Sequence, residues 1–359
     1  MKKNRSWKKL AGVVLSCVLT LLIAGDWFIS VMVYNENFGQ RMESYEPLML
    51  RVEDFEGLQR TKYTFPSDKG QMLTGYLYRA GEDQHGIVVL AHGIGAGHNS
   101  YMDCANYFAQ NGYYVFAYDA TGSDESEGEG VGGLPQGVID LDHAITFVEE
   151  NAGMPNLPIV LFGHSWGGYC VCSVLQYHPE VKAVIDCAGF DRSSDIFEAV
   201  GKELIGNGIY LMMPFVKLHE RIQFGSYASS SASKGISASE AAVMVVHSVD
   251  DETVPITYGY DVLYERYGDD PRVSFVRFMD RGHNAIFTGA DTYKDELNAA
   301  LAQWRDTLDY DNTAQENQAR FAADKAAFIH ANLDRAMWSH RLDEDLFAQF
   351  VSFYDRHVC

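Results

Sequence analysis

Short, uninterrupted apolar runs recur through the middle of this chain, and segments of helical periodicity separate them. A strand buried on both faces of a parallel sheet needs such continuous apolarity, whereas a half-exposed strand alternates. Between the runs, apolar residues recur every three or four positions, as at Val138, Leu141 and Ile145. The six runs are Ile87–Ala91, Tyr114–Tyr118, Ile159–Phe162, Ala183–Ile185, Val243–Val246 and Val273–Phe278. Repeated strand–helix units predict an α/β fold in which helices cover both faces of one mostly parallel central sheet.

The segments around these runs divide the chain further. Thr61–Pro66 and Met72–Arg79 read as two strands joined by a polar turn, which predicts a hairpin at the start of a domain covering 61–309. Residues 190–240 separate two predicted strands, and a connection of that length predicts a helical lid. Residues 310–359 read as a C-terminal helical extension.

Residues 1–34 have the pattern of a membrane anchor. Five basic residues among the first nine precede Leu10–Tyr34, which is almost wholly apolar apart from Asp26 and spans about 37 Å as a helix. The basic start predicts a cytoplasmic N-terminus, with the rest of the chain outside. A cleaved signal peptide begins in the same way and would leave a secreted domain. Residues 35–60 then form a stem or linker to the domain.

Composition narrows the possible functions. With 28 Lys and Arg against 49 Asp and Glu, the formal charge is 28 − 49 = −21, which argues against binding to nucleic acid. A hydrophobic content of 47% is too high for a disordered chain. The six cysteines have neither zinc-ligand nor disulfide-framework spacing, so we expect packing thiols, no metal and no cofactor.

The run Ile159–Phe162 leads directly into a G-x-S-x-G motif, Gly163–Gly167, and a helical pattern follows it. A serine on so tight a strand-to-helix turn occupies a strained backbone position, and glycines two residues before and after it give the turn room. Ser165 would then project above the edge of the sheet at a helix N-terminus. These features predict a nucleophilic serine.

A second glycine-rich loop, His92–Gly97, follows the run Ile87–Ala91. Such a loop can bring its backbone close to the serine, where N–H groups would stabilise the negative charge that develops on an attacked carbonyl oxygen. The backbone N–H groups of Ile94 and Trp166 are the predicted donors of this oxyanion hole.

The serine needs a base, and the base needs an acid to orient it. His283 is the predicted base because it follows the run Val273–Phe278 across a short turn, where strand ends collect. Asp250 and Asp251 both follow the run Val243–Val246, and both are candidates for the acid. Seven histidines lack a preceding strand end and are expected at the surface: His98, His143, His178, His219, His330, His340 and His357.

Taken together, these motifs resemble those of the α/β-hydrolase superfamily. Its members carry serine, acid and histidine in this order, and the acid usually begins a D-x-x-V-P pattern. Asp251–Pro255 matches that pattern, so the resemblance selects Asp251 over Asp250. Ser248 stands where the family commonly has glycine. Within the superfamily the chain looks most like S33-type serine peptidases and monoacylglycerol-lipase-like bacterial esterases with an N-terminal anchor.

The resemblance implies a serine hydrolase that cleaves a carboxylic ester or related acyl bond through an acyl-enzyme intermediate. Its substrate would be a small or lipid-like acyl compound, and no cofactor would be needed. The same triad serves an acyltransferase or a peptidase, and a non-catalytic binding protein of the same fold is a further alternative.

Overall fold

A computed structural model describes residues 3–288 and 292–358 of the chain. Three predicted segments extend beyond this range. Met1 and Lys2 of the predicted anchor, 289–291 of the predicted 61–309 domain and Cys359 of the predicted C-terminal extension lie outside the described residues.

Eight strands form one sheet in the order β1-β2-β4-β3-β5-β6-β7-β8. The first two pairings, β1 with β2 and β2 with β4, are antiparallel, and all later pairings are parallel. The strands are β1 (Gln59–Pro66), β2 (Met72–Arg79), β3 (Gly86–Ala91), β4 (Tyr113–Tyr118), β5 (Ile159–His164), β6 (Ala183–Cys187), β7 (Ala242–Ser248) and β8 (Val273–Phe278). Each predicted run is a strand, and the predicted hairpin is β1–β2. The inner strands β3, β5, β6 and β7 are buried along their whole length, as their continuous apolarity predicts. The last run differs, because β8 lies at the edge of the sheet and is only partly buried.

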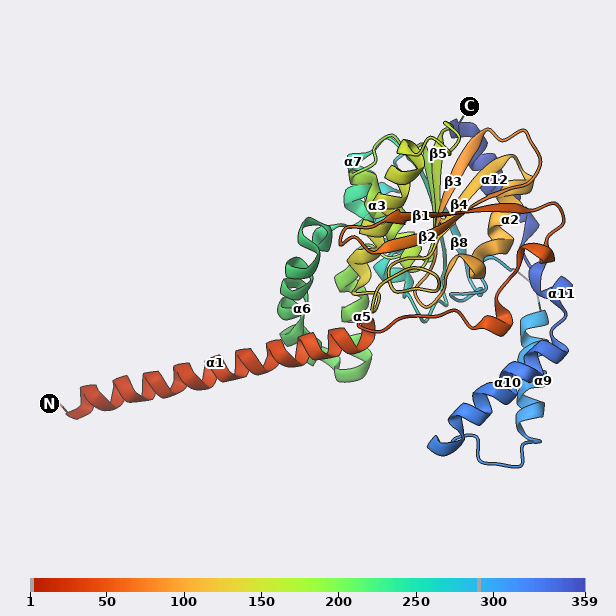
Figure 1. The fold of residues 1–359 in the computed structure, drawn as a ribbon. Helices are drawn as coiled ribbons and strands as arrows, with labels where there is room; N and C mark the ends of the chain where they lie inside the picture. The colour runs from red at the N-terminus through yellow and green to blue at the C-terminus, as the bar shows by residue number, and fades with distance from the viewer. Residues whose placement is uncertain (1–2, 289–291, 359) are drawn as a thin grey trace.

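Helices cover both faces of the sheet (Figure 1). Above one face lie α3, α4 and α7, and above the other lie α2 and α12, each face with its own apolar cluster. The helices are α1 (Lys3–Phe38), α2 (Met102–Gln110), α3 (Leu134–Glu150), α4 (Trp166–Ser173), α5 (Ser193–Ile205), α6 (Ile209–Phe224), α7 (Ala232–Ala238), α8 (Tyr260–Tyr267), α9 (Tyr293–Arg305), α10 (Gln318–Asn332), α11 (Arg335–Ser339) and α12 (Glu344–Val358). This is the α/β-hydrolase architecture that the sequence predicts.

The C-terminal helices play two different parts. Along α12, Phe347, Phe350 and Tyr354 are fully buried, and the Tyr354 hydroxyl donates a 2.6 Å hydrogen bond to the carbonyl of Leu161 in β5. The last predicted helix therefore completes one face of the sheet instead of standing apart from it. By contrast, α9 and α10 project from the domain as a pair (Figure 1).

The N-terminal helix α1 is longer than the predicted apolar segment and ends within the domain. Its last turns bury Tyr34 and Phe38 in the apolar cluster beside α3 and α4. The predicted stem also packs on the domain, because the Arg335 guanidinium binds Asp54 and the backbone N–H of Met42 bonds to the carbonyl of Gly122 at 2.9 Å. Short 3-10 turns at 46–48 and 52–54 form part of this stem.

Candidate active site

Ser165 occupies the tight turn between β5 and α4. Its backbone has φ +56° and ψ −117°, a conformation that costs about 1–3 kcal/mol for a residue with a Cβ. A Cβ on Gly163 would collide with the Gly167 carbonyl, and one on Gly167 would collide with the carbonyl of Ala91. The turn is fixed by a 2.8 Å hydrogen bond from the Ser165 N–H to the carbonyl of Cys187 in β6. The two glycines of the G-x-S-x-G motif are therefore required because any side chain at either position would collide with the neighbouring backbone, as the sequence predicts.

His283 and Asp251 meet at the same edge of the sheet. Nδ1 of His283 lies 2.7 Å from Oδ2 of Asp251, and both side chains are buried. The other carboxylate oxygen accepts hydrogen bonds from the backbone N–H groups of Thr253 and Val254, at 2.9 and 2.8 Å. Asp250 instead accepts from the Ser248 hydroxyl and the Gly282 N–H. Of the two candidate acids, the structure brings only Asp251 to the imidazole.

Electrostatics keep Asp251 ionised. Burial alone would raise its pKa, but hydrogen bonds from His247 and His283 hold the pKa well below its usual value. His247 comes from the end of β7 and places Nε2 3.3 Å from the same oxygen that meets His283. No role is predicted for His247 from the sequence, although it stands near the end of β7, four residues before Asp251.

A buried chain of hydrogen bonds connects three loops at this edge. The backbone N–H of Gly93 donates to the hydroxyl of Tyr101 at 3.0 Å, and that hydroxyl lies 2.8 Å from Nδ1 of His164. Nε2 of His164 then lies 3.1 Å from the carbonyl oxygen of His283. Burial and the neighbouring His283 lower the pKa of His164 to about 3, so its ring is neutral and can accept at Nδ1 while donating at Nε2. His164 therefore positions the loops on either side of Ser165.

The loop after β3 lies against Ser165. A Cβ built on Gly93 would be 3.5 Å from Cβ of Ser165. Nδ1 of His92 bonds to the Gly93 carbonyl at 2.7 Å, and its Nε2 accepts from the Ala120 N–H, while burial lowers the pKa of this ring. In a trans peptide the carbonyl and the following N–H point in opposite directions. Holding the Gly93 carbonyl therefore directs the Ile94 N–H to the other side of the loop.

The hydroxyl of Ser165 and Nε2 of His283 have no hydrogen-bond partner in the parts of the chain that the structure describes. Ser165 is 7% exposed and His283 9% exposed. The ring of His283 stacks obliquely at 4.8 Å on that of His164, the neighbour of the serine. A direct Ser165–His283 hydrogen bond is absent from the described residues, and such contacts in substrate-free enzymes are often long.

Some histidines expected at the surface are buried. His98 is fully buried, with Nδ1 2.8 Å from Oδ1 of Asp119. Burial would raise the pKa of that carboxyl, but the hydrogen bonds from His98 and the nearby histidines together hold the pKa below its usual value. His178 and His219 are each 6% exposed. The burial of His98 and His178 was missed because each ring meets a carboxylate more than 20 residues away, Asp119 and Asp142, which sequence spacing does not reveal.

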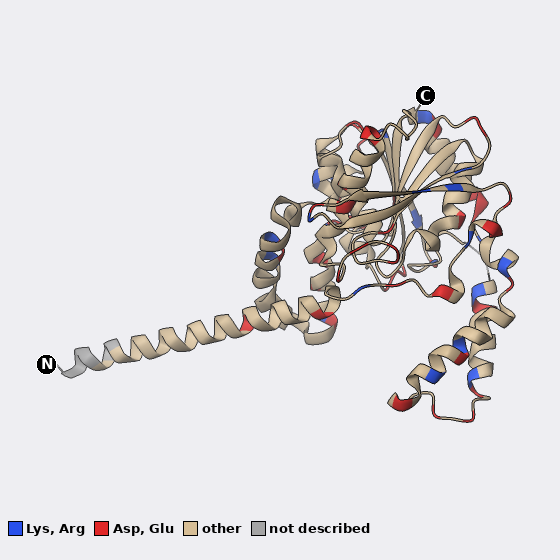
Figure 2. Ribbon diagram, in the orientation of Figure 1, with Lys and Arg blue, Asp and Glu red and all other residues tan. Residues whose placement is uncertain are grey.

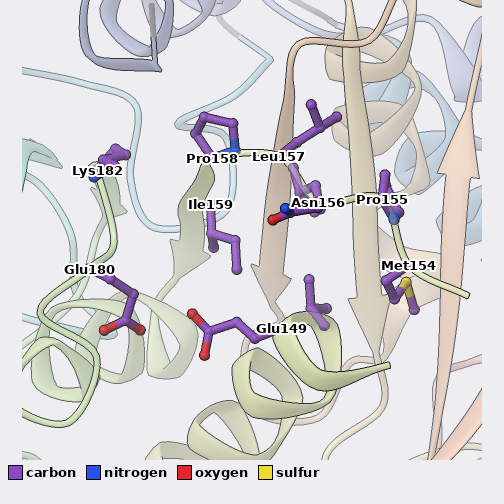
Figure 3. Close-up of a pocket in the computed structure, with 11 residues that line it drawn as sticks. Glu149, Met154, Pro155, Asn156, Leu157, Pro158, Ile159, Glu180 and Lys182 are labelled. Carbon is purple, nitrogen blue, oxygen red and sulfur yellow. The ribbon is translucent and has the colours of Figure 1, made fainter. Parts of the chain in front are cut away.

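A separate pocket lies at the opposite edge of the sheet, at the amino ends of β3 and β5 (Figure 3). Glu149 and Glu180 face each other there, and ligand atoms of Glu149, His178 and Glu180 lie within 4.8 Å of one another. Nε2 of His178 bonds to Asp142 at 2.7 Å and Nδ1 to Glu180 at 2.8 Å. These bonds raise the pKa of His178 although burial opposes the rise, so the ring itself supplies a cation among these carboxylates.

Comparisons with known proteins agree with this architecture. A family model described as "Serine aminopeptidase, S33" matches residues 82–234, a range that contains Ser165. A monoacylglycerol lipase of Mycolicibacterium smegmatis is 28% identical over 152 residues, which make up 40% of this chain and 54% of that protein. The chain thus spans about half the length of this curated relative.

Solved structures match at the level of the fold. An esterase of Pyrococcus furiosus superposes with a TM-score of 0.51 at 15% identity and covers 68% of this chain and 90% of its own. An acylaminoacyl peptidase of Pyrococcus horikoshii gives a TM-score of 0.51 at 18% identity and covers 70% of this chain and 42% of its own. With its predominantly parallel sheet and a serine at the turn after β5, the chain has the α/β-hydrolase fold of these structures.

Proposed function

We propose that this chain is a serine hydrolase that cleaves carboxylic esters with Ser165, His283 and Asp251. The observation that carries the proposal is the 2.7 Å contact between His283 and an ionised Asp251, at the edge of the sheet where Ser165 stands on its strained turn. A histidine held at Nδ1 by a carboxylate keeps Nε2 available as a base, as in other serine hydrolases.

In the proposed reaction the Ser165 hydroxyl attacks the carbonyl carbon of an ester while Nε2 of His283 accepts its proton. The resulting oxyanion binds the backbone N–H groups of Ile94 and Trp166; the latter begins α4, where an N–H has no partner within the helix. Collapse of the intermediate expels an alcohol, which takes the proton from His283. A water molecule, deprotonated by His283, then releases the acid and regenerates Ser165.

The substrate class follows from the similarity to a monoacylglycerol lipase and to an esterase. We propose a small or lipid-like acyl ester, with the helices α5 and α6 of the 190–240 segment as the lid over the site. Helix α7 of the same segment packs on α4 and covers the sheet. Amide hydrolysis by the same residues is the second candidate, favoured by the family model described as a serine aminopeptidase.

We also propose that α1 anchors the enzyme in a membrane, with the domain on the extracytoplasmic side. Within α1, Leu10–Phe38 has a mean hydropathy of 2.1 in its most apolar window, and none of that window is buried in the domain. The basic residues that precede it favour a cytoplasmic N-terminus.

A fluorophosphonate probe tests the nucleophile in the full-length chain. We expect labelling of the wild type and none of Ser165→Ala, because the probe forms a stable bond only with an activated serine. Ser100→Ala is the matched control, since Ser100 is an exposed serine following the glycine-rich loop. Equal labelling of the wild type and Ser165→Ala would refute the assignment. Aryl esters compared with aminoacyl anilides then separate esterase from peptidase activity.

A further inference from the structure

Helix α6 has two contrasting faces. Leu211, Leu218 and Ile222 are 71%, 50% and 65% exposed and, at intervals of seven and four residues, they form one line along the helix, the α6 stripe. The opposite face packs on the domain through Ile209, Met213, Val216 and Phe224. Exposing a line of large aliphatic side chains to water is unfavourable, so this face of α6 is expected to contact an apolar partner or a membrane.

The flanks of the α6 stripe differ from each other. At about 100° per residue, Lys217 and Arg221 fall on one flank, and both are exposed. Phe215 and His219 fall on the other flank, where their rings meet the indole of Trp27 in α1 at 6.3 and 6.2 Å. An apolar face bordered by cationic side chains is typical of helices that lie in a membrane interface.

The part of α1 that is long enough to span a membrane, its spanning length, ends where α6 crosses the helix. From Trp7 to Trp27 the helix rises about 30 Å, which is the thickness of the hydrocarbon core. All residues from 10 to 24 are exposed, and contact with the domain begins beside Trp27. Residues 10–25 contain no Lys, Arg, Asp or Glu, and Figure 2 shows the projecting part of α1 mostly in tan. Tryptophan is enriched at both boundaries of a bilayer, so Trp27 marks the outer one.

The contact between α1 and the domain is firm. The Tyr34 hydroxyl donates to Oε1 of Glu220 in α6 at 3.3 Å, and Ser193 of α5 donates to the same oxygen. The Tyr34 ring also stacks on Phe197 at 5.1 Å. Burial raises the pKa of Glu220 to about 7, so much of this carboxyl is uncharged near neutral pH. In Figure 1, α6 runs across the axis of α1, and the domain lies beyond it from the projecting part of α1.

We propose that α6 lies in the interface of the membrane that α1 spans, parallel to its surface. The α6 stripe enters the boundary of the acyl chains, while Lys217 and Arg221 contact lipid phosphates. Three observations carry this inference: the exposed stripe, its cationic flank, and the crossing of α6 with α1 at the outer end of the spanning length. The inference rests on the membrane anchoring proposed above and is independent of the chemistry at Ser165.

Photo-crosslinking to lipid tests the inference in the full-length chain. The protein is reconstituted into phosphatidylcholine–phosphatidylglycerol vesicles that contain a phosphatidylcholine with a diazirine in one acyl chain. After irradiation, mass spectrometry maps the lipid adducts. We expect adducts in 10–27 and in 209–224. The triple variant Leu211→Glu, Leu218→Glu, Ile222→Glu should lose at least about tenfold of the adducts in α6 and retain those in α1.

Met337→Glu is the matched control, because Met337 is 50% exposed on α11, across the domain from α1 in Figure 1. It should leave both sets of adducts unchanged. Fluorophosphonate labelling and the thermal midpoint of the triple variant establish that it is folded. Adducts along α1 with none in α6, or α6 adducts that persist in the folded triple variant, would overturn the inference. Absence of adducts from α1 would overturn the anchoring and this inference together, whatever the result at Ser165.

Discussion

Two buried histidines at opposite edges of the sheet meet carboxylates in different ways. His283, at the carboxyl edge, is held by Asp251 at Nδ1, and its Nε2 has no partner within 3–288 and 292–358. His178, beyond α4 at the amino edge, is engaged at both nitrogens, by Asp142 and Glu180. The first arrangement leaves a base that can take a proton, whereas the second makes a charged group that balances its neighbours.

Whether a buried histidine can act as a base therefore depends on how many of its ring nitrogens are hydrogen-bonded, more than on the presence of a carboxylate. A doubly bonded imidazolium has no lone pair to offer a nucleophile. The carboxylate of Asp251 is also supported by backbone N–H groups and by His247, so it stays ionised without a second contact to His283. The following predictions test this contrast.

Asp251→Asn should have the largest effect. An amide in place of the carboxylate favours the wrong tautomer of His283, and kcat for an aryl ester should fall by about 10³–10⁴-fold. The protein should remain folded, because the amide oxygen can still accept from the N–H groups of Thr253 and Val254. Stopped assays with a short aryl ester, together with the thermal midpoint, measure both quantities. A kcat within tenfold of the wild type would contradict the role of Asp251.

Tyr101→Phe should have the next largest effect. It removes the hydroxyl that links the Gly93 N–H to His164 and leaves two buried polar groups unpaired, at a cost of about 1–3 kcal/mol each. We expect a lower free energy of unfolding and a decrease in kcat of about tenfold with little change in KM, since the loop positions shift. Denaturant titration and steady-state kinetics provide the two measurements.

Tyr169→Phe is the control for that change. Tyr169 is equally buried on α4, and its hydroxyl has no hydrogen-bond partner among the described residues. Its loss should leave kcat and stability nearly unchanged. An equal loss of kcat in both variants would indicate general damage to the core and not a positioning role for Tyr101.

Asp142→Asn tests the other side of the comparison. Loss of one charged partner of His178 should reduce the free energy of unfolding by about 1–3 kcal/mol, because the ring sits between carboxylates in a mostly buried position. The value of kcat should not change, since this cluster lies at the edge opposite Ser165. A tenfold change in kcat without unfolding would show that the two edges are coupled.

Acid should destabilise the fold through His164, and just below pH 6.5 this is the smallest of the four effects. Its pKa is about 3 in the folded chain and 6.5 for the free side chain, so between these values the unfolded state binds more protons. Stability therefore falls as the pH decreases below about 6.5, by at most about 1.4 kcal/mol per pH unit from this group. His164→Gln, which can keep both hydrogen bonds without titrating, should flatten the dependence between pH 6.5 and 4. Denaturant titrations at several pH values provide the comparison.

The strands and the tight turn at Ser165 could be predicted from the sequence alone. A run such as Ile87–Ala91 reports burial on both faces directly, and the glycines around Ser165 report a turn whose steric limits are local. His283 and Asp251 were also within reach of the sequence, because parallel strands end at one edge of a sheet and a family pattern selected between two aspartates.

The hydrogen-bond and packing partners of these residues became known only from the tertiary structure. Gly93, Tyr101, His164 and His283 are connected by hydrogen bonds between separate loops, and no spacing in the sequence reports that connection. The end of α1 is a second case. Tyr34 reads as part of an apolar segment that crosses a membrane, yet it is buried against α6, far along the chain. Local sequence patterns predict whether a residue is buried. Which distant residue packs against it depends on the tertiary packing of the whole chain.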